Sequence, residues 1–259
     1  GLRRRVFVAW SAGLLGVAAL ALLWLLPTAG PRALFAQWVL FPATRYRTVG
    51  GNATVELNGF NQTVAGLAWA SGGNTAAPTI KNSGAVATLS VNPAGNQTFP
   101  GDITGNINIV KSGTNVQSLT SANLSYTGTT LVNGGELNLT TVGTMTSSVT
   151  IAGGATLGGE GATTGSLTLQ ANSALTVDPL TPGSFMAGTV NAASSPVLVK
   201  FAGAPPTTTP VLVLSAPGGI TGSAANFQAV GVRGGVFYLA NSNTELMFAA
   251  QIGDANMRS

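Results

Sequence analysis

Short apolar pairs recur through the body of this chain with a common period of about 19 residues. One series consists of single leucines, Leu137, Leu157 and Leu175, which follow one another at this interval. A second series interleaves with the first: Val149 and Ile151 recur as Leu167 and Leu169, and Leu89 and Val91 recur as Ile107 and Ile109. Two interleaved series with one period are expected when each turn of a coil contributes more than one strand, because strands one period apart then stack in register. The spacing therefore predicts a β-solenoid.

The local pattern agrees with strands. Each pair has two aliphatic residues separated by one polar residue, which is typical of a strand with one buried face. Glycine makes up 35 of the 259 residues, and runs such as Gly153-Gly154 lie beside the pairs, where glycine supplies the positive φ angles of tight turns. A β-sandwich or barrel would also give short strands with frequent turns, but the period and the turn residues together favour the coil. We therefore expect an all-β body built as a parallel β-helix.

The composition excludes several classes of site. The chain contains no histidine and no cysteine, which rules out imidazole-dependent triads, cysteine nucleophiles, His/Cys zinc sites and disulfides. The charged fraction is 7%, against about 25% in ordinary soluble domains. From Gly51 onward five basic residues accompany all seven acidic ones, so the net charge of +4 comes from the N-terminal segment. Because the body carries no basic stripe, we expect no nucleic-acid partner.

The N-terminal segment has the pattern of an export signal. A basic triplet at residues 3–5 precedes an almost unbroken apolar run from Val6 to Leu26. A positive flank, an apolar stretch and then small residues form a secretory signal, whereas about 20 apolar residues also suffice to span a bilayer as a helix. Residues 1–36 are therefore predicted to be an apolar helix that serves as a signal peptide or membrane anchor; a twin-arginine signal is a third interpretation. Residues 37–51 are expected to form a linker.

The remaining chain divides into two parts by regularity. Residues 52–180 carry the repeat and form the predicted solenoid. Residues 181–259 are less regular, with prolines that include Pro205, Pro206 and Pro210. Since an open end of a solenoid would invite aggregation, we expect this part to be a C-terminal β cap or a continuation of the coil.

Three stretches carry the pattern of a known bacterial family: residues 57–67, Lys111-Ser112-Gly113-Thr114, and residues 126–137, which begin Tyr126-Thr127-Gly128-Thr129-Thr130. Over about residues 53–180 the chain resembles the autotransporter-associated β-strand repeat proteins, although it departs from their pattern at residues 115–118. The resemblance implies a right-handed β-helix in a secreted or surface-displayed protein of passenger or stalk type. It implies no catalytic residues, because the motif is structural.

Glu160 and Asp178 are the candidate pair for chemistry. They lie one period apart, each at the third position after a core leucine, so they should stack on adjacent turns at roughly 5 Å. That separation suits a retaining glycosidase or half of a calcium site, whereas two solvated turn residues would look the same in sequence. No arginine, third carboxylate or aromatic platform accompanies them, and Phe60, Trp69 and Phe99 are expected in the core or end cap. We therefore expect no catalytic, cofactor-binding or metal site.

Two functions from different classes remain open. The first is a non-catalytic structural or adhesive module of a secreted or surface-displayed bacterial protein. Its partner would be a surface polysaccharide or another cell-surface ligand, with membrane contact through the N-terminal segment, and its location the cell surface, the outer membrane or the extracellular space. The second is a carbohydrate-active enzyme on a β-helix. An enzyme should gather ionisable residues with perturbed pKa values on one face, and the sequence favours the first.

Overall fold

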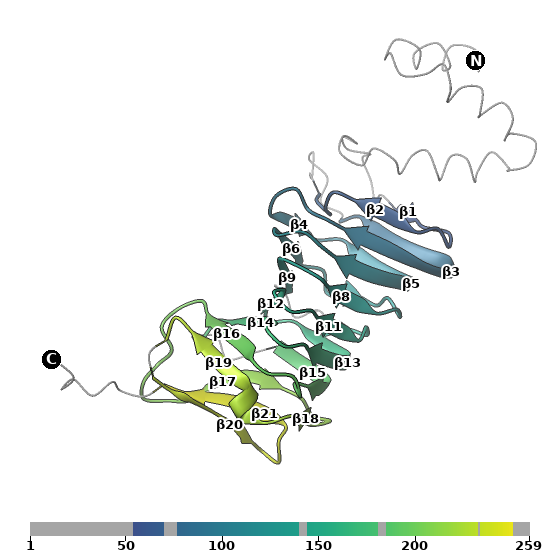
Figure 1. Ribbon diagram of the computed structural model, residues 1–259. Coiled ribbons are helices and arrows are strands. Elements are labelled where there is room, and N and C mark those ends of the chain that lie inside the picture. The colour runs from purple at the N-terminus through teal and green to yellow at the C-terminus, as the bar shows by residue number, and fades with distance from the viewer. Residues whose placement is uncertain (1–53, 70–76, 140–143, 181–184, 233, 251–259) are drawn as a thin grey trace, which may run out of the picture. The chain divides into compact units, whose positions relative to one another are not determined.

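The computed structural model describes residues 54–69, 77–139, 144–180, 185–232 and 234–250. They lie in one compact unit, Tyr46–Ser259. Apart from the short 3-10 helix η2 (Ala224–Asn226), the regular secondary structure of the described residues is β-strand, and turns and loops connect the strands. The strands stack one above another in two sheets, as Figure 1 shows. The all-β solenoid predicted from the spacing is confirmed.

Among the described residues, sheet A has 14 strands, and its main path runs β1-β3-β5-β8-β11-β13-β15-β17-β21-β20, with β2, β7, β10 and β18 beside it. Its strands are β1 (Thr54–Glu56), β2 (Gln62–Val64), β3 (Thr79–Val91), β5 (Asp102–Lys111), β7 (Asn123–Leu124), β8 (Thr130–Val132), β10 (Thr144–Met145), β11 (Val149–Ile151), β13 (Ala162–Leu169), β15 (Phe185–Asn191), β17 (Val211–Ser215), β18 (Ile220–Thr221), β20 (Val236–Ala240) and β21 (Glu245–Ala249).

In the described part of the chain, sheet B has seven strands in the order β19-β16-β14-β12-β9-β6-β4. They are β4 (Gln97–Phe99), β6 (Val116–Leu119), β9 (Glu136–Leu139), β12 (Thr156–Gly159), β14 (Ala174–Val177), β16 (Val197–Phe201) and β19 (Phe227–Val230). The chain alternates between the sheets, so each turn of the coil adds one strand to sheet B and one long or two short strands to sheet A. In strands such as β5, β6 and β9, alternate residues are buried in the space between the sheets.

The register follows the sequence period over most of the coil. Leu157 pairs with Leu137 on one side and with Leu175 on the other. Strands β11 and β13 pair in parallel at the predicted offset, with Val149 beside Leu167. These columns of stacked aliphatic side chains form the hydrophobic core.

One predicted register is wrong. Leu89 pairs with Ile109 instead of Ile107, and Val91 pairs with Lys111, so the offset between β3 and β5 is longer than the sequence period predicts. The cause is the length of sheet A in this turn, since β5 has 10 residues where β13 has 8. The shift brings a lysine into a core column.

Sheet A bends at a corner where its register slips, for example between Asn82 and Ala87. Glycines lie at this corner because the backbone of the preceding turn approaches closely. A Cβ atom on Gly105, whose φ is +88°, would overlap the carbonyl oxygen of Asn82, and one on Gly128 would overlap that of the turn before it. The corner therefore requires residues without a side chain.

The coil continues past residue 180 through β15 to β19 and then closes with the antiparallel hairpin β20–β21. Phe201 and Phe237 each contact Phe248 with ring centroids 4.9 Å apart, and Phe227 contacts Phe237 at 6.0 Å. The aromatic rings cover the last turn of the core. In this part the chain both extends the coil and covers its end.

The structure tests the expectation for the aromatic residues but not the one for the N-terminal segment. Phe99 is buried in the core, Trp69 is half-buried, and Phe60 is 40% exposed at the turn after β1, the first strand of the coil, so Phe60 is not a core residue. The predicted signal or anchor (residues 1–36) and linker (37–51) lie outside the described residues. Where the structure is described, no helix has the length and apolar character needed to cross a membrane.

Candidate functional site

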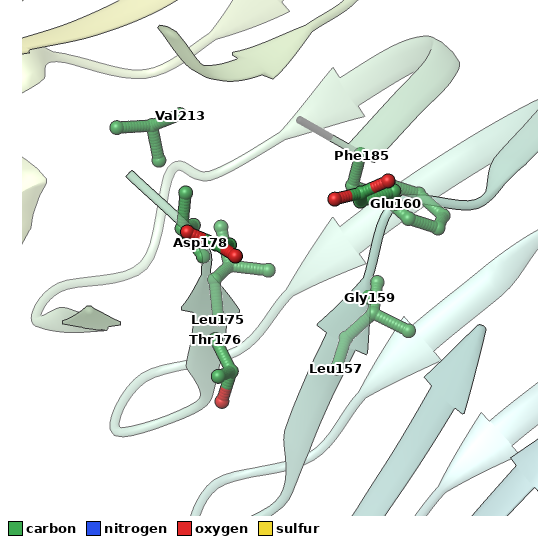
Figure 2. Close-up of a pocket in the computed structure, with 9 residues that line it drawn as sticks. Leu157, Gly159, Glu160, Leu175, Thr176, Asp178, Phe185 and Val213 are labelled. Atoms are coloured by element: carbon green, nitrogen blue, oxygen red, sulfur yellow. The ribbon is translucent and has the colours of Figure 1, made fainter. Parts of the chain in front are cut away.

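Glu160 and Asp178 occupy equivalent positions on adjacent turns, directly after β12 and β14. Both side chains are exposed, and both line one hollow, as Figure 2 shows. The floor of this hollow is apolar and includes Leu157, Phe185 and Val213. The structure thus brings together the two carboxylates that the period predicts to be neighbours.

The hollow is small. Its volume is about 10 Å³, which is at the lower limit for a single water molecule. The other lining residues are apolar side chains, a glycine and a threonine, so no further ionisable group of the described residues lines the hollow. Within the described ranges, no three His, Cys, Asp or Glu residues are grouped so that they could hold a metal ion.

The Tyr126-Thr127-Gly128-Thr129-Thr130 motif forms a buried hydroxyl network. Tyr126 is fully buried, and its hydroxyl lies 2.6 Å from Thr130 Oγ1 and 3.2 Å from Met145 Sδ. Thr130 Oγ1 lies in turn 2.9 Å from Ser147 Oγ on the next turn. Burial raises the pKa of Tyr126 to about 12. Tyr126 and Thr130 thus fill the corner of the core, where their hydroxyl groups bond to each other and to Met145 and Ser147 of the next turn.

Lys111 of the Lys-Ser-Gly-Thr stretch is an internal cation that the sequence did not reveal. Its side chain is 0% exposed, and Nζ donates to the carbonyl oxygens of Ser112 (3.0 Å), Gly113 (3.3 Å) and Gly134 (2.8 Å). Desolvation lowers the pKa of Lys111, against the attraction of Glu136. The ammonium group therefore links the loops of two successive turns of the coil.

Glu136, at the start of β9 in sheet B, is half-buried and lies close enough to Lys111 and Lys200 to interact with their charges. Burial raises the pKa of its carboxyl, and Lys200 and Lys111 oppose that shift by their charge. Lys200 Nζ donates to Thr156 Oγ1 at 3.2 Å. The Lys200 side chain therefore links its own turn of the coil to the turn of Thr156.

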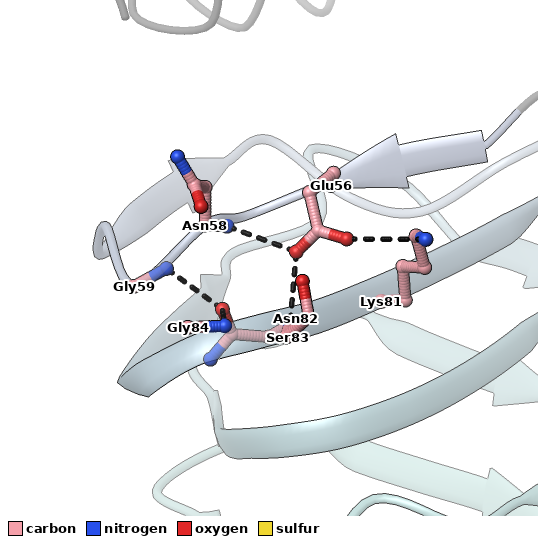
Figure 3. Close-up of polar contacts among 7 residues, drawn as sticks. All are labelled: Glu56, Asn58, Gly59, Lys81, Asn82, Ser83 and Gly84. Atoms are coloured by element: carbon pink, nitrogen blue, oxygen red, sulfur yellow. Dashed lines mark hydrogen bonds and ion pairs between the residues drawn. The ribbon is translucent and has the colours of Figure 1, made fainter.

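Figure 3 shows a second polar cluster, at the first turns of the coil. One oxygen of Glu56 accepts hydrogen bonds from the backbone N–H groups of Ser83 (2.8 Å) and Asn58 (3.2 Å), and the other lies 3.4 Å from Lys81 Nζ. Burial raises the pKa of Glu56, but the two N–H groups and Lys81 outweigh it, and the pKa is lowered. The cluster fixes the turn after β1 onto β3.

A buried glutamine is a second feature that the sequence analysis missed. Gln117 lies in the column of Leu137 and is 1% exposed. Its amide accepts a hydrogen bond from the Leu67 N–H and donates one to the Leu67 carbonyl oxygen, both at 2.9 Å. Through these two bonds the Gln117 side chain holds the segment after β2, as the backbone of a neighbouring strand would.

Part of the chain is similar in sequence to an adhesin. No family model matches it, so membership in the strand-repeat family stays a prediction. Over 85 residues the chain is 38% identical to the adhesin BmaC autotransporter of Brucella suis biovar 1 (strain 1330). The match covers 33% of this chain and 2% of that protein. The chain therefore corresponds to a small part of its relative's length.

Proposed function

We propose that the chain is a non-catalytic structural or adhesive module of a surface-displayed or secreted bacterial protein, of the passenger type. We further propose that its repeats are of the autotransporter-associated β-strand type and that the coil is right-handed. In this role the solenoid is a rigid spacer whose outer faces are available to a ligand. Residues 1–36 would direct export or anchor the chain.

The observation that carries this proposal is that the chain forms a parallel β-solenoid and is also similar in sequence to an autotransporter adhesin. A solenoid buries its core against its own neighbouring turns, so it can be extended or shortened without loss of the fold, which suits a stalk. The interior polar groups support the same function. Lys111 and Tyr126 form hydrogen bonds to groups of a neighbouring turn, and the perturbed pKa values of Lys111, Glu136 and Tyr126 follow from burial within the coil.

Labelling of intact cells tests the location. Antibodies raised against the purified full chain should bind intact cells of the source organism as strongly as lysed cells. Treatment of intact cells with external protease should abolish this antibody labelling. Labelling that requires lysis would refute surface display. A secreted form would instead be found in the culture medium, and its absence from both places would refute the proposal.

The alternative is a carbohydrate-active enzyme, and the placement of Glu160 beside Asp178 is the observation that favours it. The test is an assay of the wild type and the Glu160→Ala/Asp178→Ala variant against plant, algal and bacterial polysaccharides, with and without calcium. We expect no turnover by either protein. Turnover by the wild type that is lost in the variant would replace the structural function with the enzymatic one.

A further inference from the structure

The sequence contains two Asn-Gly pairs, Asn58-Gly59 and Asn133-Gly134. In such a pair the backbone nitrogen of the glycine can attack the side-chain amide carbon of the asparagine, because glycine has no side chain to hinder the approach. The attack forms a succinimide ring and releases ammonia, and water then opens the ring to aspartate or isoaspartate. The reaction is favoured where the asparagine side chain is exposed and no hydrogen bond holds the glycine N–H group. The two pairs differ in both respects.

Hydrogen bonds hold the first pair in place. The N–H group of Gly59 donates to Asn82 Oδ1 at 2.7 Å, and the N–H group of Asn58 donates to Glu56 Oε1 at 3.2 Å, as Figure 3 shows. Asn82 is 3% exposed, so the attack of the Gly59 nitrogen would leave a buried amide oxygen without this donor, which costs free energy. The fold therefore protects Asn58 from cyclisation.

The second pair lies in the loop between β8 and β9 and lacks this protection. Asn133 is exposed. Its backbone N–H group donates to the carbonyl oxygen of Lys111 at 2.8 Å, but its side chain has no hydrogen-bond partner among the described residues. The N–H group of Gly134 likewise has none in the part of the chain that the structure describes. Neither the attacking nitrogen nor the amide that it attacks is therefore held by the fold.

The charges beside the two pairs also differ. Lys111 Nζ donates to the carbonyl oxygen of Gly134 at 2.8 Å, which places a positive charge at the reacting glycine. The glycine nitrogen must lose its proton in the attack, and a nearby positive charge stabilises the negative charge that develops there. At Asn58 the bonded group is instead the carboxylate of Glu56, whose other oxygen lies 3.4 Å from Lys81 Nζ. Electrostatics therefore favour cyclisation at the second pair.

We propose that Asn133 is a site of spontaneous covalent modification, at which the folded chain cyclises and then converts to aspartate and isoaspartate. In the first step a bond forms between Gly134 N and Asn133 Cγ, the Cγ–Nδ2 bond breaks, and the amide group leaves as ammonia with the proton of Gly134 N. In the second step one water molecule hydrolyses either of the two ring C–N bonds. The reaction needs no enzyme, oxidant or reductant, and it is independent of the proposed function.

The modification acts on the link that Lys111 forms between successive turns. Isoaspartate lengthens the main chain between β8 and β9 by one methylene group, which displaces the Gly134 carbonyl oxygen from Lys111 Nζ. The buried ammonium group then keeps only the carbonyl oxygens of Ser112 and Gly113 as acceptors. Because β8 belongs to sheet A and β9 to sheet B, we expect the modified chain to loosen where the two sheets join.

Incubation of the purified full chain at mildly alkaline pH, followed by proteolytic digestion and mass spectrometry, tests the proposal. Conversion of amide to acid is measured over time in the peptides that contain Asn58 and Asn133, and electron-transfer fragmentation separates isoaspartate from aspartate. The same time course in urea is the reference, because unfolding removes the hydrogen bonds at both pairs. The control variant is Asn133→Gln, whose longer side chain would have to form a larger and less favourable ring. Hydrogen exchange compares β8 and β9 in fresh and converted protein.

In the folded chain Asn133 should convert about tenfold faster than Asn58, because the reaction at Asn58 must first break the hydrogen bond of Gly59. In urea the two rates should be similar, and Asn133→Gln should stop conversion at residue 133 alone. Equal or reversed rates in the folded chain, or an intact Asn133 when the unfolded chain has converted, would overturn the proposal. Aspartate without isoaspartate would refute cyclisation, and unchanged exchange of β8 and β9 would refute the effect on the Lys111 link.

Discussion

Replacing Leu167 with aspartate tests the inward register of the coil most directly. Leu167 is 0% exposed and lies in one column between Val149 and Val190 on the adjacent turns. Thr168 is the next residue on the strand and points outward, half-buried between Thr150 and Asn191. The same substitution at these two neighbours therefore places a carboxylate on opposite faces of sheet A.

The expected loss of unfolding free energy follows from the position of Leu167 in this column. Removing the buried side chain, as in Leu167→Ala, should cost about 3 to 5 kcal/mol, because the turns above and below cannot move together to fill the cavity. Leu167→Asp adds the cost of an unpaired buried charge and should exceed this by several kcal/mol. Thr168→Asp should cost less than about 1 kcal/mol, since the carboxylate stays in water and the loss is mainly one of strand preference.

Thermal unfolding followed by circular dichroism measures the difference. In a body of about 200 residues, 1 kcal/mol corresponds to roughly 2–4 °C in Tm, so Leu167→Ala should lower Tm by about 6–20 °C and Thr168→Asp by less than about 4 °C. Leu167→Asp should also remove hydrogen-exchange protection from β11 and β15, the strands on either side. Similar losses of Tm for the two aspartate variants would refute the register.

Three further predictions concern other parts of the chain. Tyr126 has a pKa of about 12 in the folded protein and about 10 when unfolded; the folded state therefore keeps its proton longer, and stability should fall between those two pH values. In Tyr126→Phe this part of the alkaline decline should be missing from urea titrations at pH 9 to 12, and an unchanged decline would count against the buried hydroxyl network. Gly105→Ala should lower Tm because of its positive φ and the carbonyl oxygen beside it, whereas Gly95→Ala, which meets no atom within 4 Å, should not; equal Tm values would contradict the close approach at the corner. A chain starting at Gly51 should remain in solution without detergent, whereas the unprocessed chain from Gly1 should require detergent because of its bilayer-length apolar run; solubility of the latter without detergent would refute the anchor.

Much of the coil could be predicted because the solenoid repeats a local pattern. The alternation of apolar and polar residues is a property of each strand, and the interval between strands is a property of each turn, so both are visible in the sequence. The column of Leu137, Leu157 and Leu175 and the adjacency of Glu160 and Asp178 follow from these two regularities alone. The same regularity failed between Leu89 and Ile107, because a strand can lengthen by two residues without any change in its alternation.

The candidate site depended on information that no local pattern contains. The sequence places Glu160 and Asp178 on neighbouring turns, but the size of the hollow between them is set by Phe185 and Val213, which belong to later turns. A lysine at the end of a strand is expected to point to solvent, since an isolated buried charge is costly.

What the sequence by itself determined is the all-β character, the period and the lack of His- and Cys-based chemistry, since these depend on residue type and spacing. Only the tertiary structure decided that Lys111 is internal and that the polar groups of Gln117 and Tyr126 are satisfied within the core. The carbonyl oxygen of Gly134 lies 23 residues after Lys111, and Leu67 lies 50 residues before Gln117. Burial of a polar group is favourable only where such distant partners meet it, and the stacking of turns decides where they meet.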